Sequence, residues 1–238
     1  MTPLLLLLAL PLAEPPSVYL IGNSLTNDTQ PERLDAGPEF HIDCGKSLPY
    51  IEENSEQPCK KDSRLWPDAL ANGRYDVVSM QTHYGSTMAG DVAAISRWIA
   101  MQPQARVVLH TGWAKSAQFD EERASTDTSG KMVHSLAWFE ELQRQLEAAH
   151  PDRTFTRTRC CEALWKIADE AVAGDAPIDS IEELYRDAIH LDLGAGRYLM
   201  HNLMRLAVGQ QPIAEWERPI EPELKTYLDE QIAYWAVQ

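Results

Sequence analysis

A serine hydroxyl stands where a buried strand is predicted to end. The apolar run at residues 17–21 stops at Gly22, and Ser24 follows within the turn that leaves it. If a helix begins at this turn, its backbone N–H groups face the oxyanion that forms when the hydroxyl attacks a carbonyl carbon. A serine at this position is also a common helix cap. The hydroxyl is therefore a candidate nucleophile, with a capping role as the alternative.

An aspartate and a histidine lie three residues apart near the other end of the chain, at Asp187 and His190. This spacing lets the carboxylate accept the Nδ1–H of the imidazole and leaves Nε2 free to take a proton from a serine. The alternative is a surface aspartate beside a core or capping histidine. Short patterns of this kind arise by chance, so neither motif decides the function alone.

The chain between these motifs alternates between strand and helix patterns. Short apolar runs rich in β-branched residues predict parallel strands at residues 17–21, 40–43, 76–80, 106–110 and 154–157. Apolar residues at three- or four-residue spacing predict helices at residues 88–101, 131–150, 161–173, 194–208 and 222–236. This alternation implies a three-layer α/β/α sandwich with a central parallel sheet, in which ligands bind beyond the carboxyl ends of the strands.

Together, residues 22–25 (Gly-Asn-Ser-Leu) and 187–190 (Asp-Ala-Ile-His) resemble the first and last blocks of the SGNH (GDSL-like) hydrolases. The first block, usually Gly-Asp-Ser-Leu, keeps its serine here, and residues 191–209 look like the family's closing helix. The resemblance implies the flavodoxin-like SGNH fold, with Ser24 as nucleophile, His190 as acid and base, and Asp187 as the residue that orients it. It also implies that neither a metal nor an organic cofactor is needed.

The resemblance further implies an oxyanion hole. The backbone N–H of Ser24 is its first donor, and Gly45, after the second strand, is placed to give a second N–H, with an ordinary turn glycine as the alternative. The family's third block carries an asparagine after the third strand, where this chain has Gln81 as the only amide. Because glutamine offers the same NH₂ donor on one more methylene, we predict Gln81 as the third donor.

Two aromatic side chains are predicted to contact substrate. His83 follows the third strand closely enough to line the pocket, with a purely structural histidine as the alternative. Trp113 lies in the polar segment 111–131 after the fourth strand, where an exposed indole would stack on a sugar ring. Packing in the core is the alternative for this tryptophan.

The charge balance narrows the possible partners. With 21 basic and 36 acidic residues the formal net charge is −15, which repels the phosphate backbone of nucleic acids. No segment has the roughly 18 consecutive apolar residues of a membrane-spanning helix, so we expect no stable membrane insertion. The four cysteines include no C-x-x-C pair, so no structural zinc site is indicated.

The chain opens with an apolar stretch that resembles a secretory signal. We expect residues 1–16 to be a leader and residues 17–238 to be the hydrolase-like domain, with a buried first strand or a frayed tail as the alternative for the leader. If residues 1–16 are a leader, we expect the protein to be exported to the periplasm or the medium. If they are not, we expect it to be cytoplasmic. In an oxidising compartment Cys44 and Cys59 form the favoured disulfide, and four reduced cysteines are the alternative.

These features predict a serine esterase that cleaves a small-molecule or carbohydrate ester through an acyl-enzyme intermediate. An exported acidic chain with a polar, aromatic rim favours a carbohydrate O-acyl esterase. Two alternatives stay open. One is a carbohydrate- or ligand-binding protein that keeps the fold without the activity, because the third block departs from the family. The other is an acyltransferase, which differs from a hydrolase only in excluding water.

Overall fold

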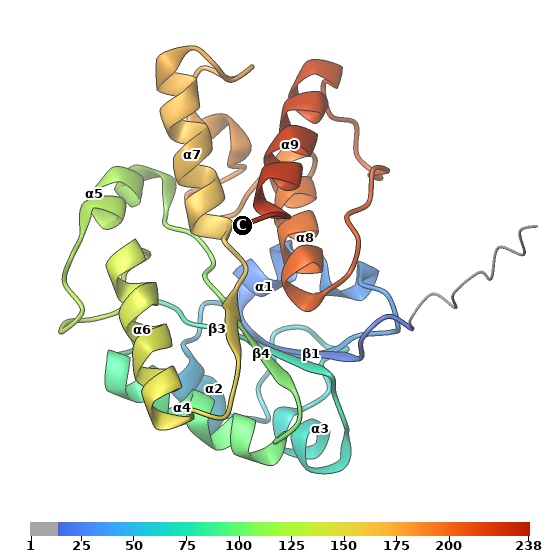
Figure 1. Cartoon of the computed structure of the whole chain (residues 1–238), viewed down its shortest axis with the longest axis vertical. Coiled ribbons are helices and arrows are strands. Elements are labelled where there is room, and N and C mark those ends of the chain that lie inside the picture. The colour runs from blue at the N-terminus through green and yellow to red at the C-terminus, as the bar shows by residue number, and fades with distance from the viewer. Residues whose placement is uncertain (1–13) are drawn as a thin grey trace, which may run out of the picture.

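The computed structural model describes residues 14–238 and contains a central parallel sheet between layers of helices (Figure 1). The strands are β1 (Val18–Gly22), β2 (Glu39–Ile42), β3 (Val77–Gln81), β4 (Arg106–His110) and β5 (Phe155–Arg157). All neighbouring strands are parallel, in the order β2-β1-β3-β4-β5. Doubly wound flavodoxin-like sheets have this order, so the predicted three-layer α/β/α fold is confirmed.

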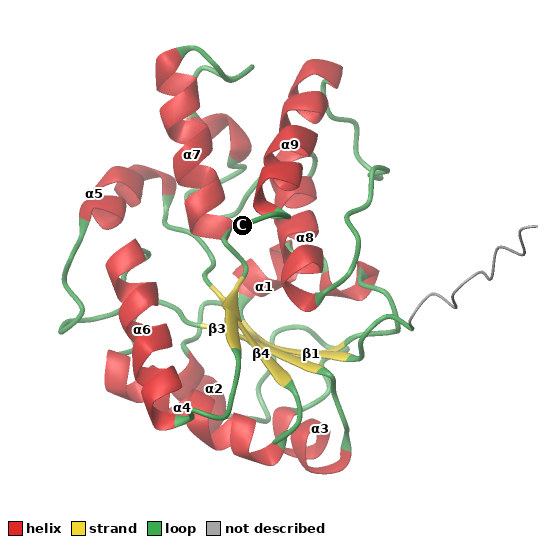
Figure 2. Ribbon diagram, viewed as in Figure 1, coloured by secondary structure: helices red, strands yellow, loops and turns green. Residues whose placement is uncertain are grey.

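The helices cover both faces of the sheet. They are α1 (Ser24–Asp28), α2 (Leu48–Glu53), α3 (Trp66–Asn72), α4 (Met88–Met101), α5 (Phe119–Ala124), α6 (Leu136–Ala149), α7 (Cys160–Ala173), α8 (Ala195–Val208) and α9 (Pro222–Trp235). Short 3₁₀ turns lie at Pro31–Arg33, Ser116–Gln118 and Ile181–Leu184. Figure 2 shows α2, α3, α4 and α6 on one side of the yellow sheet and α1, α8 and α9 on the other. Most of the predicted leader, residues 1–13, lies outside the described residues.

The strands are buried on both faces, as their continuous apolar runs predict. In β1, Tyr19 and Ile21 belong to the large core cluster, whereas Val18 and Leu20 belong to a second cluster with Met204 of α8. Side chains alternate between the two faces because successive Cβ atoms of a strand point in opposite directions. Apart from Ser79 and His41, the buried polar side chains of the strands lie at the strand ends.

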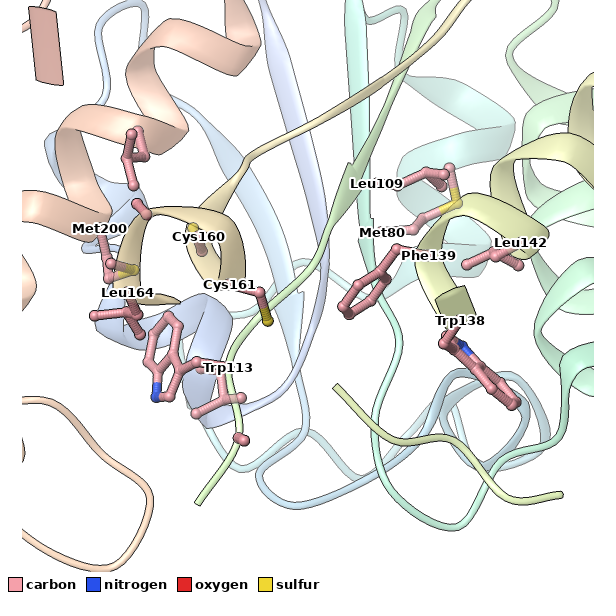
Figure 3. Close-up of a cluster of buried hydrophobic side chains, with 14 of the residues drawn as sticks. Met80, Leu109, Trp113, Trp138, Phe139, Leu142, Cys160, Cys161, Leu164 and Met200 are labelled. Atoms are coloured by element: carbon pink, nitrogen blue, oxygen red, sulfur yellow. The ribbon is translucent and has the colours of Figure 1, made fainter. Parts of the chain in front are cut away.

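Large side chains from distant segments fill the core in two groups (Figure 3). In one group Phe139 of α6 lies beside Met80 of β3, and in the other Trp113 lies beside Leu164 of α7. All four side chains are almost completely buried. The second group packs the segment after β4 against the helices that flank the candidate site.

The helix predicted at residues 131–150 is shorter than expected. α6 begins after Ser135, whose hydroxyl accepts a hydrogen bond from the N–H of Trp138 at 3.2 Å, and residues 131–135 are not helical. Met132 is buried although it lies outside the helix. Because Met132 continues the three- to four-residue spacing of buried apolar side chains, the sequence pattern predicts a helix start that is too early.

Candidate active site

Three candidate residues lie at the carboxyl ends of adjacent strands. Ser24 follows β1, Gly45 follows β2, and His83 follows β3, with β1 paired between the other two strands. Because the sheet is parallel, these three loops meet at one edge. The nucleophile candidate therefore lies between a glycine on one side and a histidine on the other.

Ser24 is the first residue of α1 and the one partly exposed residue in the segment 18–26. The side chain of Asn23 caps the helix by accepting a hydrogen bond from the N–H of Leu25 at 2.9 Å. Among residues 14–238, the backbone N–H of Ser24 has no hydrogen-bond acceptor. An N–H left open at a helix start is suited to bind an anion. The capping role considered for Ser24 thus belongs to Asn23.

Gln81 fixes the turn that carries Ser24. Its Oε1 accepts hydrogen bonds from the N–H of Asn23 (3.1 Å) and from the N–H and Oγ1 of Thr26 (3.1 and 2.8 Å). Its Nε2 donates to the carbonyl of Thr82 at 3.3 Å, and the side chain is fully buried. A Cβ on Gly22 would lie 2.9 Å from Oε1 and 2.1 Å from Oγ1 of Thr26, so only glycine allows this approach.

The predicted role of Gln81 as an oxyanion donor is therefore wrong for this geometry. The amide nitrogen Nε2 of Gln81 packs against Gly112, where a Cβ would lie 3.4 Å from it. The whole side chain is buried. The sequence shows an amide side chain at the end of the strand. It does not show that the carbonyl oxygen of this amide binds the turn of Ser24. Gln81 acts as a positioning residue that holds the Ser24 turn.

Gly45 occupies a backbone conformation that favours glycine. Its φ of 69° lies in the left-handed region, and a Cβ would meet nothing within 4 Å. A disulfide between Cys44 and Cys59 fixes one side of this loop, which confirms the predicted bridge. On the other side Asn23 Nδ2 donates to the carbonyl of Lys46 at 3.1 Å. That bond ties the loop of Gly45 directly to the turn of Ser24.

Asp187 and His190 form the predicted pair. Nδ1 of His190 lies 3.0 and 2.9 Å from the two carboxylate oxygens of Asp187. Burial alone would raise the pKa of Asp187, but hydrogen bonds from the His190 and Ile189 backbone and from the His190 ring lower it to about 2. The carboxylate is ionised at neutral pH and can orient the imidazole with its Nδ1–H inward. Within the described chain, Nε2 of His190 has no partner.

A buried carboxylate ties this pair to α1. Asp28, at the end of α1, accepts hydrogen bonds from Arg186 (3.1 and 3.2 Å) and from Arg197 of α8 (2.6 and 3.0 Å). The side chain of Asp28 is only 1% exposed, and the two guanidinium groups offset its desolvation. The helix that begins with Ser24 is thus joined at its other end to the residue before Asp187.

Trp113 does not form the predicted stacking surface. Its side chain is fully buried, and its indole N–H donates to the carbonyl of Ile189 at 2.6 Å. The N–H of Ser116 donates to the carbonyl of Ala188 at 3.0 Å. The prediction of an exposed indole is wrong because this segment folds back against the loop that contains His190. Trp113 supports the histidine from behind and leaves the substrate side to other residues.

A buried polar cluster that sequence reasoning missed adjoins His83. Glu122 accepts hydrogen bonds from the hydroxyl of Tyr84 (2.6 Å) and from the N–H and Nδ1 of His134 (2.7 and 3.1 Å). Burial alone would raise the pKa of Glu122, but these hydrogen bonds outweigh it and lower the pKa. Glu122 and His134 lie in the long connection between β4 and α6, where no motif marks them.

The same connection contains no metal-ligand pattern. Across residues 14–238, no group of three or more His, Cys, Asp or Glu side chains is placed to bind a metal ion.

None of the helices within this range is long and apolar enough to span a membrane.

Comparisons with known proteins identify the fold. No protein-family model matches the chain, and no curated protein matches it significantly. A DUF4886 family protein from Bacteroides uniformis ATCC 8492 has a similar structure, with a TM-score of 0.56 at 17% identity over 93% of this chain and 94% of that one. The likeness lies in the fold. A putative GDSL-like lipase from Parabacteroides merdae ATCC 43184 gives a TM-score of 0.49 at 17% identity, over 82% of this chain and 97% of that one.

Proposed function

We propose that the chain is a serine hydrolase that cleaves esters through an acyl-enzyme intermediate on Ser24. The observation that carries the proposal is the contact between the Asp187 carboxylate and Nδ1 of His190 at 2.9 Å, which leaves Nε2 without a partner in the described chain. The loop of this pair is tied through Asp28 to the helix that begins with Ser24. A nucleophile, a base and the group that orients the base are thus supported by adjoining elements.

The proposed reaction runs in two steps. First, Oγ of Ser24 bonds to the ester carbonyl carbon while its proton passes to Nε2 of His190, and the C–O bond to the alcohol breaks as His190 returns the proton to the leaving oxygen. Second, water attacks the acyl-enzyme and gives its proton to His190, which protonates Oγ as the acyl bond breaks. The products are an alcohol and a carboxylic acid. Asp187 stays ionised and stabilises the imidazolium throughout.

Negative charge on the carbonyl oxygen needs donors that are already in place. The N–H of Ser24 supplies one at the start of α1, and the N–H of Gly45, which has no acceptor in the part of the chain that the structure describes, supplies another. Both loops are held together by the bond from Asn23 to Lys46. Donors fixed before reaction act on the transition state without a cost of reorganisation.

The proposal of a carbohydrate acyl ester as the substrate rests on a cavity next to His83, lined in part by Tyr84. The cavity has a volume of about 710 Å³, and its lining combines the apolar side chains of Ala124 and Val133 with polar ones that include Tyr84, Lys115, Gln118, Glu121 and Ser125. Ser24, Asp187 and His190 do not line it. Hydroxyl, ammonium, amide and carboxylate groups together suit the many hydroxyls of a sugar better than a long alkyl chain. Acyl transfer to a second sugar in place of water uses the same residues and is the alternative reaction.

Labelling of the serine tests the proposal directly. A fluorophosphonate probe should react with Ser24 of the wild-type protein, and Ser24→Ala should abolish both the labelling and the cleavage of p-nitrophenyl esters and acetylated polysaccharides, with little change in melting temperature. Ser55→Ala, at another half-buried serine, is the matched control and should behave as wild type. A wild-type protein that is inert to the probe but binds carbohydrate would support the non-catalytic alternative.

Export is proposed on separate grounds. The disulfide between Cys44 and Cys59 is of a kind that persists in oxidising compartments, and an apolar stretch precedes the domain in the sequence. N-terminal sequencing of protein from its native cell should find a first residue between about 13 and 17. An intact N-terminal methionine would contradict export by this route.

A further inference from the structure

His83 lies level with Ser24 on the neighbouring strand end. Ile21 of β1 pairs with Met80 of β3, so Ser24 and His83 each follow that pair by three residues. The two strands are hydrogen-bonded neighbours, and β2 with Gly45 lies on the other side of β1. His83 therefore follows the strand on one side of Ser24, and Gly45 follows the strand on the other side.

The ring nitrogens of His83 make no hydrogen bond within the described chain. The residue is only 6% exposed, and its Nδ1 is enclosed without a hydrogen-bond partner in the described chain, whereas Nε2 is not enclosed. Gln81, the other candidate on this loop, has both ends of its amide bonded within the protein. A buried polar ring usually makes hydrogen bonds, and the open Nε2 at the strand end that neighbours Ser24 is available to a ligand atom.

Two aromatic neighbours hold the ring in position. The centroid of the His83 ring lies 4.9 Å from that of Tyr84 and 6.2 Å from that of His134. Both neighbours are anchored to Glu122, Tyr84 through its hydroxyl and His134 through its backbone N–H and Nδ1. One buried carboxylate thus fixes both surfaces against which His83 packs.

His83 is neutral at ordinary pH. Burial is the main cause that lowers its pKa to about 3, and the neighbouring His134 and Lys115 add to the lowering. A neutral imidazole donates one N–H and has no charge that would compete with His190 for the proton of Ser24.

We propose that His83 is a catalytic residue that donates its Nε2–H to the oxyanion formed on the acyl carbonyl at Ser24. Together with the N–H groups of Ser24 and Gly45 it completes a three-donor oxyanion hole. Glu122 and His134 are positioning residues for this ring. The inference rests on the proposed ester cleavage and names the group that stabilises its transition state.

Ring and amide replacements separate the role of the N–H from that of the ring volume. His83→Phe keeps a ring without a donor and should lower kcat by about 10²-fold with KM nearly unchanged, because an oxyanion donor acts mainly on the transition state. His83→Gln carries its amide nitrogen near the position of Nε2 and should restore most of kcat. His83→Asn carries it near Nδ1 and should restore less. Thr82→Val, at the adjacent buried hydroxyl that also has no partner in the described chain, is the control and should leave kcat unchanged.

The outcomes distinguish a failure of the His83 assignment from a failure of the hydrolase proposal. If wild-type protein labels at Ser24 and cleaves esters while His83→Phe keeps kcat within about threefold, or if Thr82→Val loses kcat instead, the assignment of His83 is overturned and the hydrolase proposal stands. If wild-type protein neither labels nor cleaves any ester, both fall. Melting curves are recorded for every variant, and His83→Ala replaces His83→Phe in the comparison if the phenylalanine variant does not fold.

Discussion

Removal of the Gln81 amide should loosen the nucleophile turn. In Gln81→Met the side-chain volume is nearly kept, but the N–H groups of Asn23 and Thr26 and the hydroxyl of Thr26 lose their common acceptor. All of these groups are buried. A buried donor left without a partner costs about 1 to 3 kcal/mol, so three of them lower the free energy of unfolding by about 3 kcal/mol or more. For a chain of this size that loss lowers the melting temperature by roughly 6 to 12 °C.

Thermal unfolding followed by circular dichroism measures this effect. Gln81→Glu is the matched control because a protonated glutamic acid keeps both the carbonyl acceptor and a donor toward Thr82. Gln81→Glu should therefore melt closer to the wild-type protein than Gln81→Met does. We also expect Gln81→Met to lose kcat, since a displacement of about 1 Å at the nucleophile costs on the order of 10²-fold in rate.

The melting temperature and kcat together show whether Gln81 positions the turn of Ser24 or donates directly to the oxyanion. If Gln81→Met melts within about 1 °C of the wild-type protein, the three hydrogen bonds do not stabilise the turn and the positioning role is refuted. If in addition kcat falls with KM unchanged, the amide itself donates to the oxyanion. That second result would return Gln81 to the role expected from its place after β3 and remove His83 from it.

Two further predictions concern pH and the disulfide. Asp187 has a folded pKa of about 2 against an ordinary 3.8, so its stabilising contribution is present above about pH 4 and is lost as the pH falls toward 2. The free energy of unfolding, measured by urea titration, should therefore fall less over this range in Asp187→Asn, and equal falls would contradict the linkage. Replacing Cys44 and Cys59 together by serine opens a loop with a sequence separation of 15 and should cost about 3 kcal/mol of stability, and an unchanged urea midpoint would contradict this.

The sheet could be predicted because its strands are buried on both faces. The run at residues 76–80 became β3 (Val77–Gln81), and the run at residues 106–110 became β4 with the same bounds. Continuous apolar runs of this length suit parallel strands between helix layers. The pairing of Asp187 with His190 was also predictable, because a three-residue spacing fixes the reach of the carboxylate locally.

Contacts between distant segments could not be predicted in this way. Asp28 lies far along the chain from Arg186 and Arg197, and no spacing rule connects a carboxylate in one short helix to guanidinium groups near the other end. The same holds for Glu122 and His134, whose burial depends on how the long connection after β4 folds. Tertiary packing decides such contacts, and the sequence offers only the residue types.

The positions of Trp113 and Gln81 follow a common physical reason. Each hydrogen-bonds a backbone atom in a loop of the candidate triad: the indole N–H of Trp113 donates to the carbonyl of Ile189, and Oε1 of Gln81 accepts from the N–H of Asn23. Ser24, Asp187 and His190 in turn stay at least partly exposed. Ser24 and His190 exchange protons during the proposed reaction and cannot also be enclosed, so part of their orientation has to come from neighbouring groups. Changes at the buried supports should therefore alter rate and stability together, whereas a change at Ser24 should alter rate alone.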